Sequence, residues 1–270
     1  MTILVTGAGG NVGSALLPLL ADRGLPVRAL RRDASLDPQM GGVRAVFLAC
    51  GNVPQQVEFE TSVIDAAARS GVRRIVKLSA RGALRGSPVA FWDWHAAIEQ
   101  HLADSGIPAT VLRPSFLMTN LLAGADQVRH QGVLVAPVGE ARVAMIDPAD
   151  VAAVAAVALT DDGDESSVLT LTGPESLSWH DVAERLSSVA GRPVGYVDVP
   201  PAAALGAMVE NGLPEFAATQ IVNVFDALRA GSQEETTGVV AGMTWQPGRT
   251  LGEFVRAHAE AFGRLDPVSR

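Results

Sequence analysis

A glycine-rich motif near the N-terminus has the composition of a ligand-binding turn. It reads Gly7-Ala8-Gly9-Gly10-Asn11-Val12-Gly13, after a β-branched apolar run at 2–6 and before a segment with helical apolar spacing at 14–20. In this order of strand, turn and helix, the first glycine allows a tight turn, the second lets the backbone approach a pyrophosphate, and the third allows close helix packing. The helix N-terminus then offers free N–H groups to phosphates. The motif therefore predicts a dinucleotide site.

Two arginines follow the next expected strand and discriminate between dinucleotides. This strand covers 26–30 and is followed by Arg31 and Arg32. A carboxylate at this position ordinarily binds the ribose 2′-hydroxyl of NAD, whereas arginines suit the 2′-phosphate of NADP. We therefore expect NADPH/NADP as cofactor; the alternative is that both arginines are solvated surface charges. The expected cofactor-binding residues are Gly7, Gly9, Gly10, Asn11, Val12, Gly13, Arg31, Arg32, Ala49, Gly51, Ser79 and Pro114.

The elements that must position these residues alternate along the chain. Further strands are expected at 43–50, 73–79 and 109–112, with helices at 55–70 and 91–105. Strands that alternate with helices predict an α/β fold with a doubly wound parallel sheet, which is a Rossmann fold.

Beyond Pro114 the pattern loosens into shorter pieces. Strands are expected at 143–146 and 168–171, and helices at 148–159, 178–190, 202–208 and 216–228. We expect residues 1–150 to form mainly an NADP-binding domain. Residues 151–270 are expected to form mainly a small C-terminal substrate-binding lobe and lid, packed with that domain as one unit.

The composition favours small-molecule ligands. The 270 residues are 48% hydrophobic and 19% charged, with a formal net charge of −8, which indicates a globular protein without attraction to nucleic acid or anionic lipid. The single cysteine, Cys50, cannot form an internal disulfide, and the histidines lack metal-site spacing. We see neither a leader pattern nor an apolar run of about 20 residues. We expect a cytoplasmic protein with no metal, no nucleic acid and no membrane partner.

Several motifs together resemble one family. They are the glycine motif, the two arginines, the run His95-Ala96-Ala97-Ile98-Glu99 and the strand end Val111-Leu112-Arg113-Pro114. Over most of its length the chain resembles the atypical short-chain dehydrogenases/reductases of the NmrA-like group. That group includes quinone, azo-dye and triphenylmethane reductases, isoflavone-reductase-like enzymes and catalytically silent NADP sensors, so the fold does not choose among activities. The chain is also similar to ketoreductases of angucyclinone polyketide pathways.

The resemblance implies a catalytic set that this chain has only in part. Ordinary short-chain dehydrogenases use serine, a proton-donating tyrosine and a lysine that lowers the tyrosine pKa. Ser79 matches the serine, but Phe91 stands where tyrosine is expected and His95 where lysine is expected. The only tyrosine, Tyr196, lies far along the chain. The only lysine, Lys77, is on the strand before Ser79 rather than on the helix.

Ser79 and His95 are therefore the candidate catalytic residues. Ser79 is expected either to hydrogen-bond a substrate carbonyl or to bond nearby backbone. His95 is expected either to contact the ribose or donate a proton, with a usual pKa of about 6.5, or to be an exposed helix histidine. If neither is the acid, the proton comes from water or from a substrate hydroxyl beside the ketone.

The connection at 33–42 is shorter than the family pattern. It has only ten residues, including Pro38, Gly41 and Gly42, where the family inserts another strand and helix and an acidic residue that helps to bind adenine. We expect one strand-helix unit to be missing after strand two. Either the sheet is one strand narrower or the sequence omits a segment.

Apolar and aromatic residues suggest the substrate. The expected substrate residues are Phe91, Trp92, Phe116, Met118, Met208 and Phe225; the alternative for each is a place in the core. The sequence predicts NADPH-dependent reduction of a ketone on a bulky aromatic, polyketide-like small molecule, without the usual Tyr/Lys pair and with possible substrate assistance. One alternative is a quinone or dye reductase. An alternative of another class is a non-catalytic NADP-sensing regulator.

Overall fold

The computed structural model describes residues 2–31, 34–161 and 163–263. It divides into two compact units that alternate along the chain. The first unit contains 1–114, 148–171 and 238–247, and the second contains 115–147, 172–237 and 248–270. Among the described residues, no helix combines the length and apolar character needed to cross a bilayer.

The first unit is built on a six-stranded parallel sheet of order β2-β1-β3-β4-β5-β8. Its interior strands are apolar on both faces, as parallel sheets covered by helices require; Ile3, Leu4 and Val5 have no exposed surface. Since all strands are parallel, the segments that follow them meet at one edge of the sheet. The strands are β1 (Thr2–Val5), β2 (Val27–Ala29), β3 (Val43–Leu48), β4 (Arg74–Leu78), β5 (Ala109–Pro114) and β8 (Ser167–Leu171).

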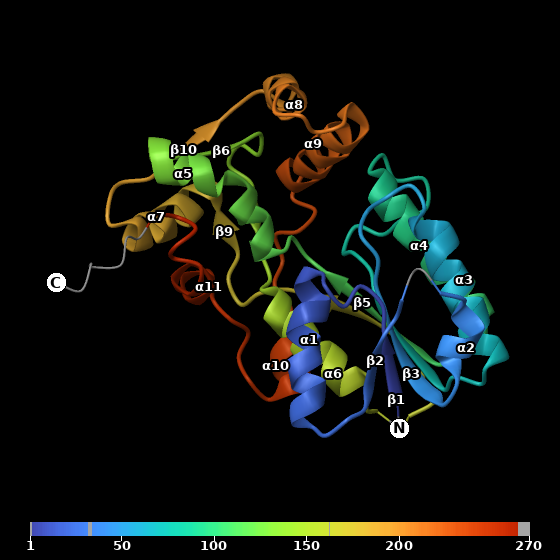
Figure 1. Ribbon diagram of the computed structural model, residues 1–270. Coiled ribbons are helices and arrows are strands. Elements are labelled where there is room, and N and C mark those ends of the chain that lie inside the picture. Colours follow the sequence, from blue (N-terminus) through green and yellow to red (C-terminus); the bar gives the residue numbers. More distant parts are fainter. Residues whose placement is uncertain (1, 32–33, 162, 264–270) are drawn as a thin grey trace. The chain divides into compact units, whose positions relative to one another are not determined.

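Helices cover both faces of this sheet (Figure 1). One layer contains α1, α6 and α10, in which α6 contacts both other helices, and the opposite layer contains α2, α3 and α4, in which α3 contacts both neighbours. The bounds are α1 (Asn11–Asp22), α2 (Leu36–Met40), α3 (Gln56–Arg69), α4 (Ala90–Asp104), α6 (Pro148–Ala158) and α10 (Val239–Thr244). The predicted α/β fold with a parallel sheet is confirmed.

The connection from β2 to β3 is short, as expected from its sequence. The five-residue helix α2 is its only helix, and β2 pairs with β1 alone among the described residues. The sheet therefore ends at β2, which agrees with the expectation of a missing strand-helix unit. Helix α2 itself is not expected from the sequence, because Pro38 and the two glycines after it are typical of a turn.

The second unit is a smaller mixed structure. Its core surrounds Trp179, Phe254 and Phe262, which are almost fully buried. Helix α7 begins after Ser178 in a capping box with Asp181. Two two-stranded sheets pair β6 with β10 and β7 with β9. The elements are η1 (Met118–Gly124), α5 (Ala125–Gln131), β6 (Val133–Ala136), β7 (Arg142–Val143), β9 (Leu177–Ser178), α7 (Trp179–Ala190), β10 (Gly195–Asp198), α8 (Pro201–Glu210), α9 (Glu215–Arg229) and α11 (Leu251–Ala257).

The division of the chain into these units differs from the single boundary near residue 150 that the sequence suggested. Residues 115–147 belong to the second unit, whereas 148–171 and 238–247 return to the first. The reason is strand pairing: β8 pairs with β5 from Thr110↔Ser167 to Pro114↔Leu171, so the segment that carries β8 must join the sheet.

Candidate functional site

The glycine motif forms a turn that only glycine permits at two positions. Gly7 has φ +61°, in the left-handed region, and its carbonyl oxygen accepts a hydrogen bond from the Gly10 N–H at 2.9 Å. A Cβ atom on Gly13 would lie 2.2 Å from the same oxygen. Helix α1 follows with Gly10 as its N-cap, no side-chain cap and no acidic residue in its first turn. The turn therefore fits a dinucleotide pyrophosphate.

Helix α2 holds the backbone of Arg31 in place. The Arg31 N–H donates to Gln39 Oε1 at 2.8 Å, and Gln39 Nε2 donates to the Arg31 carbonyl oxygen at 3.0 Å. Arg31 is exposed, so a guanidinium at a fixed backbone position follows the second strand. Arg32, the other predicted arginine, lies outside the described residues.

The remaining predicted cofactor residues lie at the carboxyl edge of the sheet. Thr6 Oγ1 donates to the Ala49 carbonyl oxygen and accepts from the Ala49 N–H, both at 2.7 Å, which joins the ends of β1 and β3. Ala49 and Pro114 are buried, and Gly51 is exposed. The sheet topology thus brings these strand ends to the edge where Gly7 follows β1.

Ser79 belongs to a polar network with two residues of the family-like motifs. Its hydroxyl donates to Glu99 Oε1 on α4, and Glu99 in turn pairs with Arg113 on β5. Arg113 Nε donates to Oε1 at 3.1 Å and Nη2 to Oε2 at 2.5 Å. The side-chain hydrogen bond to Glu99 raises the pKa of Arg113. Since its proton is donated to Glu99, the Ser79 oxygen is left as an acceptor for any ligand.

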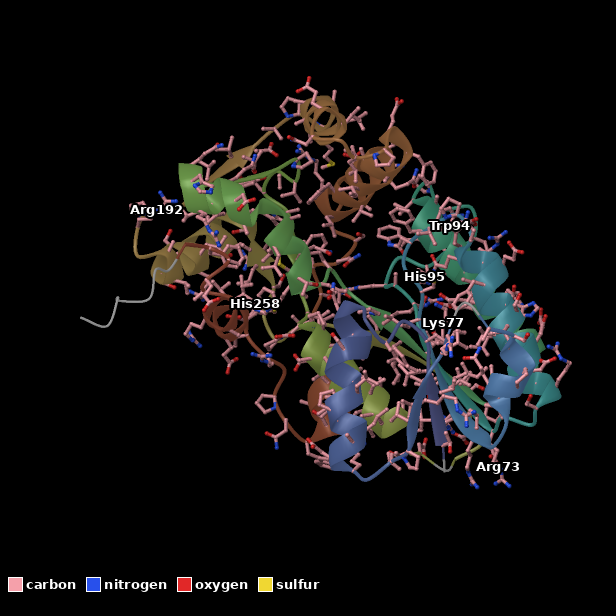
Figure 2. The ribbon with its side chains drawn as sticks, viewed as in Figure 1. Arg73, Lys77, Trp94, His95, Arg192 and His258 are labelled. Carbon is pink, nitrogen blue, oxygen red and sulfur yellow. The ribbon has the colours of Figure 1, made fainter. Side chains whose placement is uncertain are left out.

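A buried ion pair between Lys77 and Glu60 contacts His95, which lies one turn before Glu99 on α4. Lys77 Nζ on β4 is 2.7 Å from Glu60 Oε2 on α3, and neither side chain has exposed surface. Lys77 Nζ also lies 3.1 Å from His95 Nδ1 on α4. Gln56, the first residue of α3, places Nε2 3.2 Å from Glu60 Oε1 and 3.3 Å from His95 Nδ1. Figure 2 shows Lys77 and His95 beside each other in the first unit.

This environment corrects two expectations about His95. The residue is 6% exposed rather than a surface histidine. Burial, and then the charge of Lys77, lower the pKa of His95 well below its usual value. At neutral pH the ring is therefore uncharged, and it does not carry the acidic proton that a pKa near its usual value would supply.

Sequence reasoning set Lys77 aside because it is on a strand rather than on the helix. The structure brings its ammonium to His95, the position where the family places lysine. Glu60 and Gln56 were not anticipated at all. The available signal was a lone lysine within the apolar run Ile75–Leu78 and a Gln/Glu pair four residues apart on the preceding helix, α3. Such a lysine is buried only when it is paired.

The expected substrate residues fall into both units. On α4, Phe91 and Trp92 are partly exposed, and the Trp92 indole lies directly on Gly82, where a Cβ would approach a ring atom to 2.2 Å. In the second unit, Phe116 and Phe225 are partly exposed, with ring centroids 6.2 Å apart. The Trp179 ring contacts both of these rings.

The two methionines among the predicted substrate residues differ in exposure. Met208 on α8 is partly exposed. Met118 is 2% exposed and is part of the core of the second unit, so it supports its neighbours there. The Phe116 backbone N–H donates to Gln233 Oε1 at 2.7 Å, a contact across 117 residues that no local pattern predicts.

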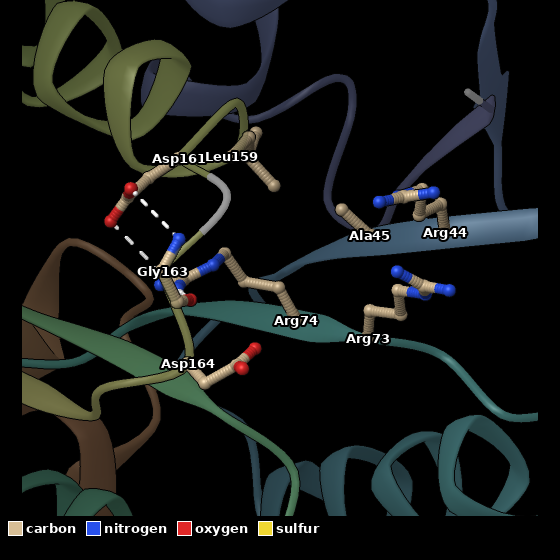
Figure 3. Close-up of a pocket in the computed structure, with 8 residues that line it drawn as sticks. All are labelled: Arg44, Ala45, Arg73, Arg74, Leu159, Asp161, Gly163 and Asp164. Atoms are coloured by element: carbon tan, nitrogen blue, oxygen red, sulfur yellow. Dashed lines mark hydrogen bonds and ion pairs between the residues drawn. The ribbon is translucent and has the colours of Figure 1, made fainter.

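A small polar hollow lies elsewhere, at the amino ends of β3 and β4 (Figure 3). Arg44, Arg73 and Arg74 line it with Asp161 and Asp164. Arg74 is buried, donates to Thr110 Oγ1 at 3.2 Å and lies 3.8 Å from Asp161 Oδ2. In a parallel sheet this edge is opposite the glycine turn, so the hollow is separate from the predicted dinucleotide site.

Comparisons with known proteins agree with these features. The model of the NmrA-like family matches residues 33–255. The chain is 36% identical over 283 residues to NAD(P)H azoreductase of Xenophilus azovorans, covering 97% of this chain and 99% of that protein. The alignment is longer than this chain, so the azoreductase holds residues that this chain lacks, as the short connection after β2 suggests.

Two further proteins are similar to this chain over nearly its whole length. The chain is 36% identical over 282 residues to (4-alkanoyl-5-oxo-2,5-dihydrofuran-3-yl)methyl phosphate reductase of Streptomyces griseus, covering 96% of this chain and 99% of the other. The solved structure of the NADPH-dependent quinone oxidoreductase of Escherichia coli in complex with NADPH is similar, with a TM-score of 0.83 and 27% identity over 95% of this chain and 99% of that chain. With its glycine turn, its His95 and Glu99 networks and these matches, the chain belongs to the NmrA-like family.

Proposed function

We propose that this protein reduces a planar conjugated acceptor of the quinone or azo type with NADPH. The class of reaction follows from the relatives that match nearly the whole chain: this protein is an NAD(P)H-dependent oxidoreductase. The glycine turn and the exposed Arg31 fit the phosphorylated dinucleotide. The choice of acceptor is the proposal.

The observation that carries the choice is the lack of an acidic proton on either candidate catalytic residue. The Ser79 hydroxyl donates to Glu99, and His95 is uncharged at neutral pH. A simple ketone forms a localised, strongly basic alkoxide on reduction and requires a proton donor in the transition state. A quinone forms a delocalised hydroquinone anion, which water protonates afterwards. The site therefore suits an acceptor that tolerates a delayed proton.

The residues of this chain then have positioning roles. NADPH supplies the hydride when bound, and the protein orients the partners and excludes water. The turn at Gly7 and Gly13 binds the pyrophosphate, and Arg31 binds the 2′-phosphate. Ser79 accepts a hydrogen bond from an amide of the ligand. The partly exposed ring of Phe91 on α4, in the same unit as the glycine turn, provides apolar surface for a planar acceptor.

A second candidate is the ketone reduction that the sequence suggested, on a bulky aromatic, polyketide-like compound. The same lack of an acidic side chain favours it only for a ketone with a neighbouring phenolic hydroxyl. Such a hydroxyl hydrogen-bonds the carbonyl within the substrate and donates its proton to the developing alkoxide.

Absorbance of NADPH separates these possibilities. The acceptors are a naphthoquinone, a monoazo dye, and a tetralone with and without a hydroxyl beside its ketone. We expect NADPH oxidation with the quinone or the dye and none with the plain tetralone. Oxidation by the hydroxytetralone alone supports the second candidate. Equal rates with the plain tetralone and the quinone contradict the argument from the missing acid. Tight NADPH binding with no oxidation by any acceptor identifies a nucleotide-sensing protein instead.

A further inference from the structure

The ring of His95 meets two hydrogen-bond donors at a single atom. Nδ1 lies 3.1 Å from Lys77 Nζ and 3.3 Å from Gln56 Nε2. The Gln56 amide is oriented by Glu60, because rotating it would turn its oxygen toward Glu60 Oε1, a carboxylate oxygen that can only accept. An ammonium and an amide N–H₂ can only donate, so Nδ1 must be the acceptor and the ring proton is on Nε2.

The charges around His95 hold this arrangement in place. From β4 the ring faces Lys77, which also contacts Glu60 Oε2 and the Leu78 carbonyl oxygen, so three acceptors surround its ammonium. From α3 it faces Gln56, with Glu60 behind it. On its own helix the carboxylates of Asp93 and Glu99 are paired with Arg85 and Arg113, respectively. A proton on Nδ1 would face the ammonium at 3.1 Å, an arrangement that electrostatic repulsion opposes.

The other ring nitrogen is left with its proton available. His95 is 6% exposed, and Nε2 has no hydrogen-bond partner among residues 2–31, 34–161 and 163–263. Nδ1 and Nε2 project in widely different directions from an imidazole ring, so Nε2 points away from the donors that fix Nδ1. Nε2 is not one of the fully buried polar atoms without a partner, so a ligand atom can reach this N–H and accept its hydrogen bond.

We propose that Lys77, supported by Glu60 and Gln56, is a positioning residue that holds His95 as the neutral Nε2–H tautomer, and that this N–H donates to an oxygen atom of the bound coenzyme or acceptor. A neutral imidazole at such a place polarises an oxygen without transferring a proton to it. The proposal rests on the proposed function for its ligand. Its structural half, which is the protonation state and tautomer of the His95 ring, can be tested without any activity.

Nitrogen-15 NMR of histidine rings tests that half directly. Long-range ¹H–¹⁵N spectra distinguish the Nδ1–H, Nε2–H and doubly protonated forms of each ring, and the variant His95→Gln assigns the signal among the five histidines. We expect His95 to show the Nε2–H pattern at neutral pH, because burial and then the charge of Lys77 lower the pKa of its ring. An Nδ1–H pattern or a protonated ring for His95 at neutral pH overturns the proposal.

The role of Lys77 is tested by a double variant chosen to remain folded. Lys77→Met with Glu60→Met replaces both buried charges by apolar groups of similar volume, a change that proteins often tolerate. We expect the pKa of the His95 ring to rise, because the opposing ammonium is gone while the burial of the ring remains. Single Gln56→Leu leaves the charge and is expected to shift the titration less. An unchanged His95 spectrum in the double variant rules out Lys77 as the positioning residue.

Ligand additions identify the acceptor of the Nε2–H group. A change of the His95 Nε2 signal on adding NADP⁺ alone assigns the donor to the coenzyme. A change that appears only on adding a naphthoquinone to the NADP⁺ complex assigns it to the hydride acceptor. No change in either case, with NADP⁺ binding shown by calorimetry, overturns the ligand half of the proposal. If NADP⁺ does not bind, the proposed function is wrong. The NMR spectrum of the His95 ring still tests the tautomer separately.

Discussion

Lys77 Nζ lies 2.7 Å from Glu60 Oε2, with both side chains completely removed from solvent. Removing one partner leaves an uncompensated charge in the core, whereas removing both does not. We expect Lys77→Met to lower the free energy of unfolding by about 3–5 kcal/mol. The double variant with Glu60→Met should regain most of that loss. Urea denaturation measures both, and a double variant as unstable as the single one would contradict this account.

His95 makes the stability depend on pH with a defined sign. Its native pKa is lowered, so in mildly acidic solution the unfolded chain binds a proton that the native protein does not. Stability is therefore fully present above the unfolded pKa, about 6.5, and falls as the pH decreases below it, by about 1.4 kcal/mol per pH unit until the native pKa is reached. We expect His95→Gln to flatten this slope in thermal unfolding between about pH 6.5 and 5.

Gly13 is predicted to be essential for the turn that precedes α1. A Cβ atom there would lie 2.2 Å from the Gly7 carbonyl oxygen, so Gly13→Ala must displace the backbone. We expect the dissociation constant of NADPH to rise by at least about tenfold, equivalent to about 1.4 kcal/mol. Gly242→Ala, on α10 of the same unit, is the matched control, because no atom lies within 4 Å of a Cβ at that position. Calorimetry and the melting temperature report the two effects separately.

Arg31 is predicted to select NADPH over NADH. Loss of a charge-assisted hydrogen bond to the 2′-phosphate costs about 1.5–3 kcal/mol. Arg31→Ala should therefore weaken NADPH binding by about tenfold or more and leave NADH binding nearly the same. Arg73→Ala, an exposed arginine at the amino end of β4, is the control for net charge. Equal weakening by the two variants would show that general electrostatic attraction, rather than a contact, is responsible.

Ser79 is predicted to bind rather than to donate a proton. Its hydroxyl donates to Glu99, so Ser79→Ala should raise the coenzyme dissociation constant by about fivefold, the value of one neutral hydrogen bond of about 1 kcal/mol. The kcat for a quinone should change little, because no proton transfer from Ser79 is involved. Ser62→Ala, an exposed serine on α3, is the control. A large fall in kcat with unchanged coenzyme binding would assign Ser79 an acidic role.

The fold was predictable because its signals are local. The apolar runs that became β1, β3, β4 and β5, separated by helical spacing, define a parallel sheet, and the Gly7 to Gly13 spacing locates the dinucleotide turn. The coenzyme prediction followed from the same local signals and agrees with relatives solved with NADPH. Helix α2 could not be predicted, because a five-residue helix that contains a proline is too short to show hydrophobic periodicity.

The contacts of the candidate site were less predictable. Ser79 and His95 could be named from their spacing, but their chemical states depend on side chains that meet only in three dimensions. Lys77 and His95 are 18 residues apart, on a strand and a helix, and Gln56 is 39 residues from His95. No local pattern indicates that these groups converge on one nitrogen atom, and that convergence decides whether the ring is an acid.

The interleaved order of the two units has a practical consequence for protein engineering. A fragment that stops at residue 150 would lose β8, which pairs with β5 along five residues, and with it most of α6 and all of α10. The exposed edge of β5 would then invite association between copies. Coenzyme-binding fragments of this protein should therefore be obtained by replacing internal segments with short linkers, and not by truncation at either end.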